Sequence, residues 1–125
     1  MQIKLSDSPG IWVGNRLSEQ IDQCLQDFSP SKIWILADTN TAKYCLNSLY
    51  ADSPLLKNAG LIEIETGEHN KSLQTSRLIW ETLAREGADR QSILINLGGG
   101  IVGDIGGFAA STFMRGIPFI HMPTT

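Results

Sequence analysis

The sequence lacks the features that would place a protein in a membrane, outside the cell or on nucleic acid. No apolar run is long enough to span a bilayer, and residues 1–5 lack the apolar core and cleavage site of a signal peptide. The net charge of −3 gives no general attraction to nucleic acid or to anionic lipid. We therefore expect a soluble, cytoplasmic protein with no nucleic-acid or membrane partner.

Cysteine and histidine are scarce, which argues against a metal site. Cys24 and Cys45 are the only cysteines and do not have the spacing of metal ligands. Both fall in apolar helical patterns, so we interpret them as buried small hydrophobic residues in a reducing cytosol. His69 and His121 share no ligand spacing with each other or with carboxylates, and we interpret His121, which lies in an apolar strand, as a core histidine. The sequence therefore predicts no metal ligand in this chain.

Internal repeats and low-complexity segments are also absent. The 125 residues are 42% hydrophobic and 18% charged, as is typical of one globular domain with its own core. The sequence stops just after an expected strand, at Pro123-Thr124-Thr125, without a packed element or a polar tail. We therefore expect a truncated domain of a longer protein.

Short strand-like segments alternate with longer helix-like segments along the chain. Strands are expected at residues 3–5, 11–13, 32–37, 61–64, 92–97 and 117–122. Helices are expected from a cap at Ser18 to a stop at Pro30, through residues 44–49, briefly at 55–56, and at 72–86 and 101–113. Strands separated by helices imply right-handed βαβ units. The prediction is an α/β fold, a Rossmann-like parallel sheet flanked by helices.

Two of these segments carry detailed expectations about packing. The first helix should bury Ile21, Cys24, Leu25 and Phe28. The helix at 72–86 should turn Leu73, Ser76, Ile79, Trp80 and Leu83 inward, with Gly87 as its C-cap.

Residues 96–108 contain six glycines and one carboxylate directly after the apolar run 93–95. A buried strand that leads through glycines into a helix can hold a pyrophosphate, because glycine lets the backbone approach and the helix start offers free N–H groups. The spacing Gly98-x-Gly100-x-x-Gly103 matches the dinucleotide fingerprint. Alone the match indicates little, since many glycine-rich turns bind nothing.

Asp104 separates this segment from an ordinary dehydrogenase. We expect it in the first helical turn, where the helix dipole would favour a carboxylate by about 0.3–1 kcal/mol. It would repel a pyrophosphate there, so its better functional role is to accept hydrogen bonds from the sugar or carboxamide end of a dinucleotide. The usual acidic residue after the next strand is missing, because residues 122–125 read Met-Pro-Thr-Thr. The chain is therefore not a standard Rossmann dehydrogenase.

Polar clusters follow other strands at the edge where parallel sheets bind ligands. After residues 33–37, Thr39 or Asn40 could cap a helix, or Asp38 and Asn40 could contact a nucleotide ribose or base. In the loop 66–71, Glu68 and Lys71 could be solvated, or could contact sugar hydroxyls and a phosphate or ribose oxygen.

Two further alternatives concern helix ends. Ser72 or Asn70 could cap the helix at 72–86. Arg115 could help to satisfy a helix C-terminus or could bind a phosphate, for which a guanidinium is well suited.

Together these segments resemble the 3-dehydroquinate synthase family. The matching pieces are residues 67–73 followed by Ile79-Trp80, the glycine block 98–110, Met114-Arg115-Gly116-Ile117 and Pro123-Thr124-Thr125, and Asp38-Thr39-Asn40 also fits. The glycine block combined with Met-Arg-Gly is specific, and the order and spacing agree over essentially the whole chain.

The resemblance implies that residues 1–125 are an NAD-binding domain and that the C-terminal metal and substrate domain is absent. It implies no catalytic and no metal-binding residue here, and a substrate-phosphate role for Arg115, supplied across the interface of a homodimer. The positions implied for NAD binding are Asp38, Asn40, Thr66, Gly67, Glu68, His69, Asn70, Lys71, Gly99, Gly100, Ile101, Val102, Gly103, Asp104, Thr124 and Thr125.

The family converts 3-deoxy-D-arabino-heptulosonate 7-phosphate to 3-dehydroquinate and phosphate, a lyase reaction of the shikimate pathway of aromatic amino acid biosynthesis. It uses NAD and a divalent metal, zinc or cobalt, whose ligands are not in this chain. The chain alone is therefore expected to be inactive. Two alternatives stay open: another sugar-phosphate cyclase, of the valiolone or aminocyclitol type, and a non-catalytic nucleotide-binding module.

Overall fold

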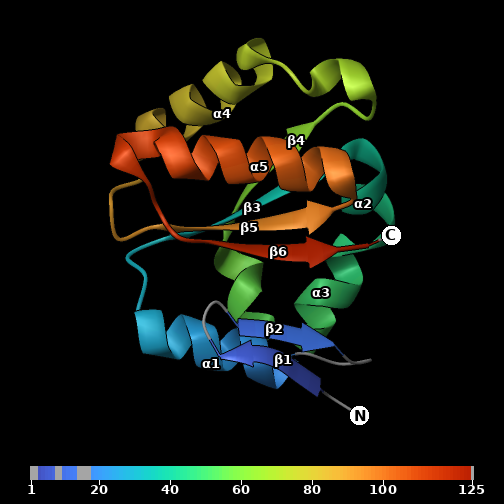
Figure 1. The fold of residues 1–125 in the computed structure, drawn as a ribbon, viewed down its shortest axis with the longest axis vertical. Helices are drawn as coiled ribbons and strands as arrows, with labels where there is room; N and C mark the ends of the chain where they lie inside the picture. Colours follow the sequence, from blue (N-terminus) through green and yellow to red (C-terminus); the bar gives the residue numbers. More distant parts are fainter. Residues whose placement is uncertain (1–2, 8–9, 14–17, 125) are drawn as a thin grey trace.

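A four-stranded parallel sheet forms the centre of the molecule, which the computed structural model describes over residues 3–7, 10–13 and 18–124 (Figure 1). The strand order is β4-β3-β5-β6. These strands are β3 (Ile33–Asp38), β4 (Gly60–Ile64), β5 (Ile93–Gly98) and β6 (Phe119–Pro123). A separate antiparallel pair consists of β1 (Ile3–Asp7) and β2 (Gly10–Val13). The predicted Rossmann-like α/β fold is confirmed.

Helices cover both faces of the parallel sheet (Figure 1). They are α1 (Ser18–Phe28), α2 (Thr39–Tyr44), α3 (Leu46–Asp52), α4 (Leu73–Arg85) and α5 (Gly100–Thr112), with short 3₁₀ turns η1 (Pro54–Asn58), η2 (Glu68–Asn70) and η3 (Phe113–Arg115). Within the described residues, no helix has both the length and the apolar character needed to cross a membrane.

The core is divided into two layers by the alternation of side chains along the strands. Trp34 and Leu36 of β3 face α4 and α5, whereas Ile35 faces α1, α3 and η1. All six residues of β5 are buried, as a strand covered on both faces requires. Because the four strands are parallel, they all end at the same edge of the sheet, which we call the carboxyl edge.

Several local expectations are confirmed. Ser72 caps α4, because its Oγ accepts a hydrogen bond from the Thr75 N–H at 3.3 Å. Gly87, at φ +85°, follows the last turn of α4, and its N–H bonds to the Ala84 carbonyl. The next N–H, of Ala88, bonds to the Leu83 carbonyl. These two bonds form the Schellman motif that a left-handed glycine allows.

Other expectations are wrong. The helix expected through residues 44–49 is two helices that meet at Cys45, whose φ of −115° is far from the usual helical value although its N–H still donates to the Thr41 carbonyl. Cys24 is exposed and Cys45 half-buried, so neither is a core residue. Phe28 and Leu73 are also exposed, at 36% and 71%; Phe28 is the last residue of α1 and Leu73 is the first of α4.

One strand boundary differs slightly from its prediction, and two predictions fall on residues that the structure does not describe. The last strand begins at Phe119 instead of residue 117. The side chain of Ser18, expected to cap α1, and the turn residues 8–9 lie outside the described residues.

Candidate functional site

The glycine turn joins β5 to α5 at the carboxyl edge. Gly99 is the N-cap residue of α5, and no side chain caps this helix. The first intrahelical bond runs from the Gly103 N–H to the Gly99 carbonyl at 3.0 Å. The N–H groups of Gly100, Ile101 and Val102 therefore have no acceptor within the helix and point out of its first turn. Such a turn attracts anions.

The glycines at this turn have two distinct functions. A Cβ on Gly98 would lie 2.7 Å from the Val102 side chain, so this glycine lets strand and helix meet closely. A Cβ on Gly100 would meet nothing within 4 Å. Gly100 therefore borders open space, into which a ligand could approach the backbone.

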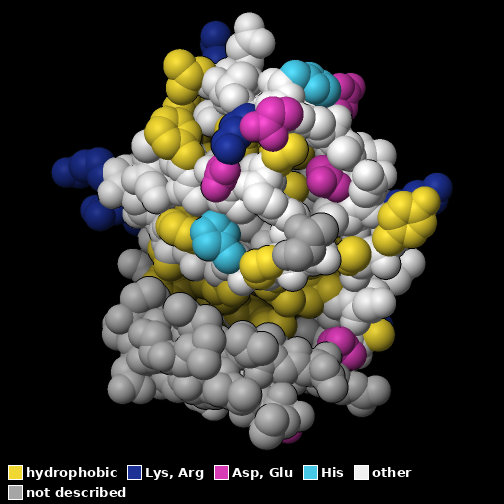
Figure 2. Space-filling model, turned by 45° about the vertical axis from the view of Figure 1, so that its right-hand side comes forward, with side chains coloured by type: hydrophobic (Ala, Val, Ile, Leu, Met, Phe, Trp, Pro, Cys, Tyr) yellow, Lys and Arg dark blue, Asp and Glu magenta, His cyan; other side chains and the backbone are white. Residues whose placement is uncertain are grey.

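A cavity of about 320 Å³ opens beside the glycine turn. Figure 2 brings this side of the molecule forward and shows acidic and basic side chains close together on it. The cavity is lined by Asn96, Gly98, Gly99, Gly100, Gly103, Asp104, His121 and Pro123. Backbone donors, a carboxylate, an amide and an imidazole therefore surround one volume.

An ion pair connects the loop before α4 to the helix after the glycine turn. The Lys71 Nζ lies 2.6 Å from the Asp104 Oδ2 and 3.9 Å from the Glu68 Oε1. The hydrogen bond and charge of Asp104, followed by the charge of Glu68, raise the pKa of Lys71 above its ordinary value. Three residues expected at a nucleotide site, Glu68, Lys71 and Asp104, thus lie together although 36 positions separate the first from the last.

The placement of Asp104 corrects one expectation. It is the fifth residue of α5, which begins at Gly100, and so belongs to the second turn. There the helix dipole stabilises a carboxylate less, because the effect falls off within the first turn. Asp104 follows Gly100 by one helical turn, so it lies further along α5 than the N–H groups of the first turn.

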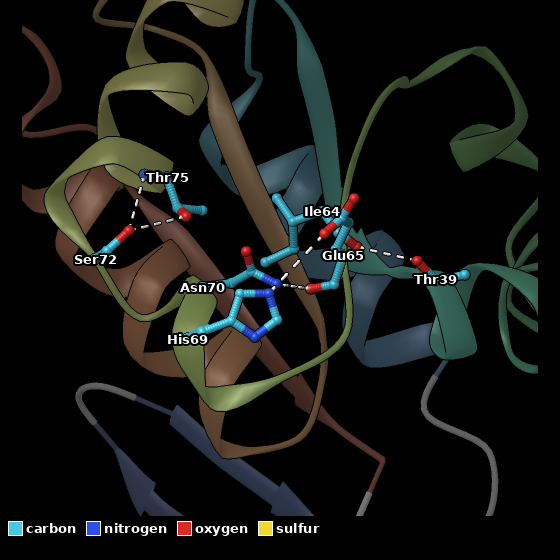
Figure 3. Close-up of polar contacts among 7 residues, drawn as sticks. All are labelled: Thr39, Ile64, Glu65, His69, Asn70, Ser72 and Thr75. Carbon is cyan, nitrogen blue, oxygen red and sulfur yellow. Dashed lines mark hydrogen bonds and ion pairs between the residues drawn. The ribbon is translucent and has the colours of Figure 1, made fainter.

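Contacts within residues 65–70 shape the loop that carries Lys71 (Figure 3). The Asn70 side-chain amide donates to the Glu65 carbonyl, and the His69 Nε2 lies 3.9 Å from the Glu65 Oε2. Gly67 has φ +134°, a conformation that favours glycine, and a Cβ there would lie 2.7 Å from the His69 ring. Thr66 and Glu68 are exposed. The loop is therefore closed by its own contacts and directs Lys71 toward α5.

Asp38 ends β3 at the same edge of the sheet, and it caps α2 itself. Its Oδ1 accepts from the Thr41 N–H at 2.8 Å, while its own N–H donates to the Thr41 Oγ1 at 3.0 Å. This reciprocal pair is a capping box, so the expectation that Thr39 or Asn40 would cap is wrong. Thr39 instead donates to the Ile64 carbonyl (Figure 3), and Asn40 is exposed.

The end of β6 is also held against the glycine turn. The Thr124 N–H donates to the Gly98 carbonyl at 3.1 Å. Thr124 is exposed, and Thr125 lies outside the described residues. The structure thus brings Thr124 to the strand end that leads into the glycine turn, next to Pro123, which lines the cavity.

Arg115 is not brought to this site. It lies in η3, beyond the C-terminal end of α5, whose 13 residues span about 20 Å at 1.5 Å per residue. Met114 and Arg115 adopt positive φ values of 47° and 68°, which are uncommon without glycine. Arg115 is exposed. Within one chain, Arg115 therefore lies at the opposite end of α5 from the glycine turn.

The sequence analysis does not predict a role for Asn96, although a polar residue within an apolar strand indicates one. It is the only polar residue in the strand Ile-Leu-Ile-Asn-Leu, and it is 1% exposed. His121 lies opposite it on β6, and its Nδ1 is 3.3 Å from the Asn96 Nδ2. The interpretation of His121 as a core histidine is wrong, because β6 borders the described sheet and the residue is exposed.

A metal site is not found in the part of the chain that the structure describes. No three histidine, cysteine, aspartate or glutamate residues there are grouped so as to hold a metal ion. A metal centre built from these residues is therefore not supported.

Residues 61–125 match the family model of the N-terminal part of 3-dehydroquinate synthase. A 3-dehydroquinate synthase of Parabacteroides distasonis is 47% identical over 105 residues, 81% of this chain and 30% of the relative. One of Syntrophotalea carbinolica is 38% identical over 122 residues, 92% of this chain and 32% of the relative. The chain thus spans about a third of the length of these relatives.

Solved structures share the fold. A 2-deoxy-scyllo-inosose synthase superposes with a TM-score of 0.82 at 22% identity, covering 99% of this chain and 36% of that one. A 2-deoxy-scyllo-inosose synthase complexed with carbaglucose-6-phosphate, NAD⁺ and Co²⁺ gives 0.77 at 25% identity, covering 100% of this chain and 34% of that one. Both superpositions cover almost the whole of this chain.

Proposed function

Because the chain belongs to the 3-dehydroquinate synthase family, we propose that it is the NAD-binding portion of such an enzyme. The complete protein would convert 3-deoxy-D-arabino-heptulosonate 7-phosphate to 3-dehydroquinate and phosphate. The observation that carries this proposal is the ion pair of Lys71 with Asp104 beside the uncapped start of α5. It joins two distant segments, both expected at a dinucleotide site, and one of its partners, Asp104, lines the cavity.

The described residues fit a bound dinucleotide. The N–H groups of Gly100, Ile101 and Val102 would hold the diphosphate, and the open space at Gly100 would admit it. Asp104, one turn further along α5, would accept hydrogen bonds from a ribose hydroxyl or from the carboxamide. Lys71 and Glu68 would contact sugar or phosphate oxygens from the facing loop. Asp38, Asn40, Gly99, Gly103 and Thr124 complete the proposed surface.

When bound, NAD would supply transient oxidation of a ring carbinol, which acidifies the neighbouring C–H. The chain's own residues would bind and orient the cofactor without forming a covalent bond to it. Support for NAD comes from the related synthase, whose structure is a complex with NAD⁺ and Co²⁺. The divalent metal, zinc or cobalt, would be held by a C-terminal domain, since the described residues offer no metal cluster.

We also propose that Arg115 acts across a homodimer. Its position at the far end of α5 leaves it about 20 Å from the glycine turn of its own chain, as 13 helical residues require. An arginine so exposed is free to reach the substrate phosphate in a second copy. The cytoplasmic location belongs to this proposal too, and the two unpaired cysteines agree with a reducing compartment.

Turnover by the full-length protein tests the proposal. With 3-deoxy-D-arabino-heptulosonate 7-phosphate, we expect release of phosphate and 3-dehydroquinate that requires both NAD and a divalent metal. Chelation of the metal should stop release, and added zinc or cobalt should restore it. Formation of a valiolone or aminocyclitol precursor from another sugar phosphate would favour a different cyclase. Tight NAD binding without turnover of any sugar phosphate would favour a non-catalytic module.

A further inference from the structure

Asn96 and His121 border the cavity at the glycine turn, yet neither belongs to the proposed NAD-binding residues. They are direct partners on neighbouring parallel strands, β5 and β6, and both lie on the face of the sheet that α5 covers. Their side chains therefore meet beneath the helix that begins at the glycine turn.

Asn96 is almost completely buried and only partly satisfied. It is 1% exposed, and its Oδ1 has no hydrogen-bond partner among the described residues. Its Nδ2 lies 3.3 Å from the His121 Nδ1. A buried amide with an unpaired oxygen destabilises a fold, so its presence at a cavity calls for a functional reason.

The contact with Asn96 decides which nitrogen of His121 carries the proton. With the amide oriented as in this structure, the Asn96 Nδ2 donates and the His121 Nδ1 accepts. The neutral imidazole then carries its hydrogen on Nε2, which is assigned from this hydrogen bond. His121 is exposed, and its Nε2 lies on the side of Gly107, where a Cβ would be 3.5 Å from it.

Two glycines of α5 make room for the imidazole ring. A Cβ on Gly103 would lie 3.7 Å from the His121 Nδ1, and one on Gly107 would lie 3.3 Å from its Cε1. The ring also contacts Phe119, with 5.0 Å between the centroids, and Phe119 itself lies near Gly107. The ring thus lies along the second turn of α5, one turn beyond the N–H groups that would take a diphosphate.

We propose that the His121 Nε2–H donates a hydrogen bond to an oxygen of the nicotinamide-ribose half of the bound dinucleotide. Asn96 is a positioning residue that holds the imidazole in the donating tautomer. Asp104 and His121 then offer an acceptor and a donor beside the same cavity, a combination that matches ribose hydroxyls or a carboxamide. This inference rests on the proposed function and adds two residues to its site.

Calorimetric titration of the full-length protein with NAD and with ADP tests the contact, because ADP has the diphosphate but lacks the nicotinamide-ribose half. His121→Ala should weaken NAD binding roughly tenfold, as expected for one lost hydrogen bond, and leave ADP binding unchanged. His121→Gln, which places an amide N–H near the position of Nε2, should recover most of the NAD affinity. Met122→Leu, on the opposite face of β6, is the matched control and should bind both ligands as the wild type does.

Each other outcome overturns the inference. Equal losses of NAD and ADP affinity would place His121 at the diphosphate or at the adenosine, and unchanged NAD affinity would remove it from the site. Asp104→Ala separates these failures from failure of the proposed function. If the wild type binds NAD and Asp104→Ala does not, the cofactor site stands even where His121 has no effect. If the wild type binds no NAD, the proposed function fails first.

The positioning role of Asn96 has a separate readout. In ¹⁵N spectra of the imidazole, His121 of the free wild-type protein should carry its hydrogen on Nε2. Asn96→Leu, which keeps a similar volume but no donor, should give a mixture of the two tautomers. A wild-type ring protonated on Nδ1 would contradict the assignment. Should Asn96→Leu fail to fold, the His121 variants and the wild-type spectrum still decide the question.

Discussion

The two edges of the parallel sheet carry cavities of similar size but opposite character. At the amino edge, where the strands begin, a cavity of about 430 Å³ is lined by residues that include Lys32, Trp34 and Gly60. Lys32 donates to the Glu86 carbonyl at 3.1 Å, at the end of α4. At the carboxyl edge, the cavity is smaller, about 320 Å³, but it borders free backbone N–H groups.

The two edges differ in which polar groups lack a partner, since the Trp34 Nε1 at the amino edge is unpaired too. Near the amino edge, Ser31 donates to Asp89, and this hydrogen bond is the main cause that lowers the pKa of that carboxyl. The charged and polar groups there serve to close helix and loop ends. Near the carboxyl edge, the start of α5 is uncapped and the Asn96 Oδ1 is unpaired. The uncapped helix start with its backbone donors, and not cavity volume, therefore marks the functional edge.

Asp104→Ala should have the largest effect, because it removes an acceptor from the functional edge. In the full-length protein we expect turnover to fall about 100-fold, the upper range for a hydrogen bond to a charged group. Steady-state kinetics with saturating metal measures the change. Asp89→Ala, near the amino edge, is the matched control and should retain turnover at temperatures where it is folded. Wild-type activity of Asp104→Ala would refute its role.

Arg115→Ala tests whether a residue from the opposite edge completes the site of a second chain. We expect kcat/KM for the phosphorylated substrate to fall roughly 10- to 100-fold, with NAD affinity unchanged, since a charged contact to phosphate is lost. Mixing this variant with Asp104→Ala should recover part of the activity, because a mixed dimer would contain one intact site. Unchanged kinetics would remove Arg115 from the site, and absence of recovery would contradict action across the dimer.

Two glycine substitutions should separate binding from stability at the two edges. In Gly100→Ala the added Cβ would have no atom within 4 Å, so the melting temperature should stay unchanged. NAD binding should weaken about tenfold or more, because the methyl group occupies the space through which the cofactor approaches the backbone. Gly60→Ala would place its Cβ 2.3 Å from Trp34, so the melting temperature should fall while the folded protein binds NAD normally. Calorimetry and thermal denaturation measure both. The reverse pattern would contradict the distinction between the edges.

The smallest effect should come from the ion pair itself. The pKa of Lys71 lies above its ordinary value of 10.5, so its stabilisation is present below that pH and is lost as the pH rises through the raised pKa. NMR titration of the Lys71 side chain should show a lower midpoint in Asp104→Asn than in the wild type. An identical midpoint would mean that the two side chains do not pair in solution. Because both are exposed, the melting temperature should change little.

The sequence predicts the sheet better than it predicts the site. Apolar runs such as residues 93–95 and helix-ending residues such as Gly87 determine local structure. The predicted strands are present, and their ends lie within one or two residues of the observed ends. The break at Cys45 and the exposure of Cys24 depend on where neighbouring elements end, which no local pattern contains.

Contacts between residues from distant segments are the part of the site that the sequence predicts least well. The contact of Lys71 with Asp104 needs the parallel register and the length of α4 before it can be seen. Asn96 gave a local signal, a single polar residue in a buried strand, but its meaning depends on His121 opposite it. The roles proposed for these residues in binding remain predictions, which the variants above test.

The close contact between Asn96 and Gly106 has a consequence for how this sequence can change. A Cβ at position 106 would lie 2.0 Å from the Asn96 Oδ1. A side chain at position 106 therefore requires a residue shorter than Asn at position 96, so position 96 must change first. In the reverse replacement, position 106 must return to glycine before position 96 returns to Asn. Substitutions at the two positions are therefore coupled. The single variant with a smaller residue at 96 has a cavity and can fold, whereas the single variant with a side chain at 106 has a steric clash.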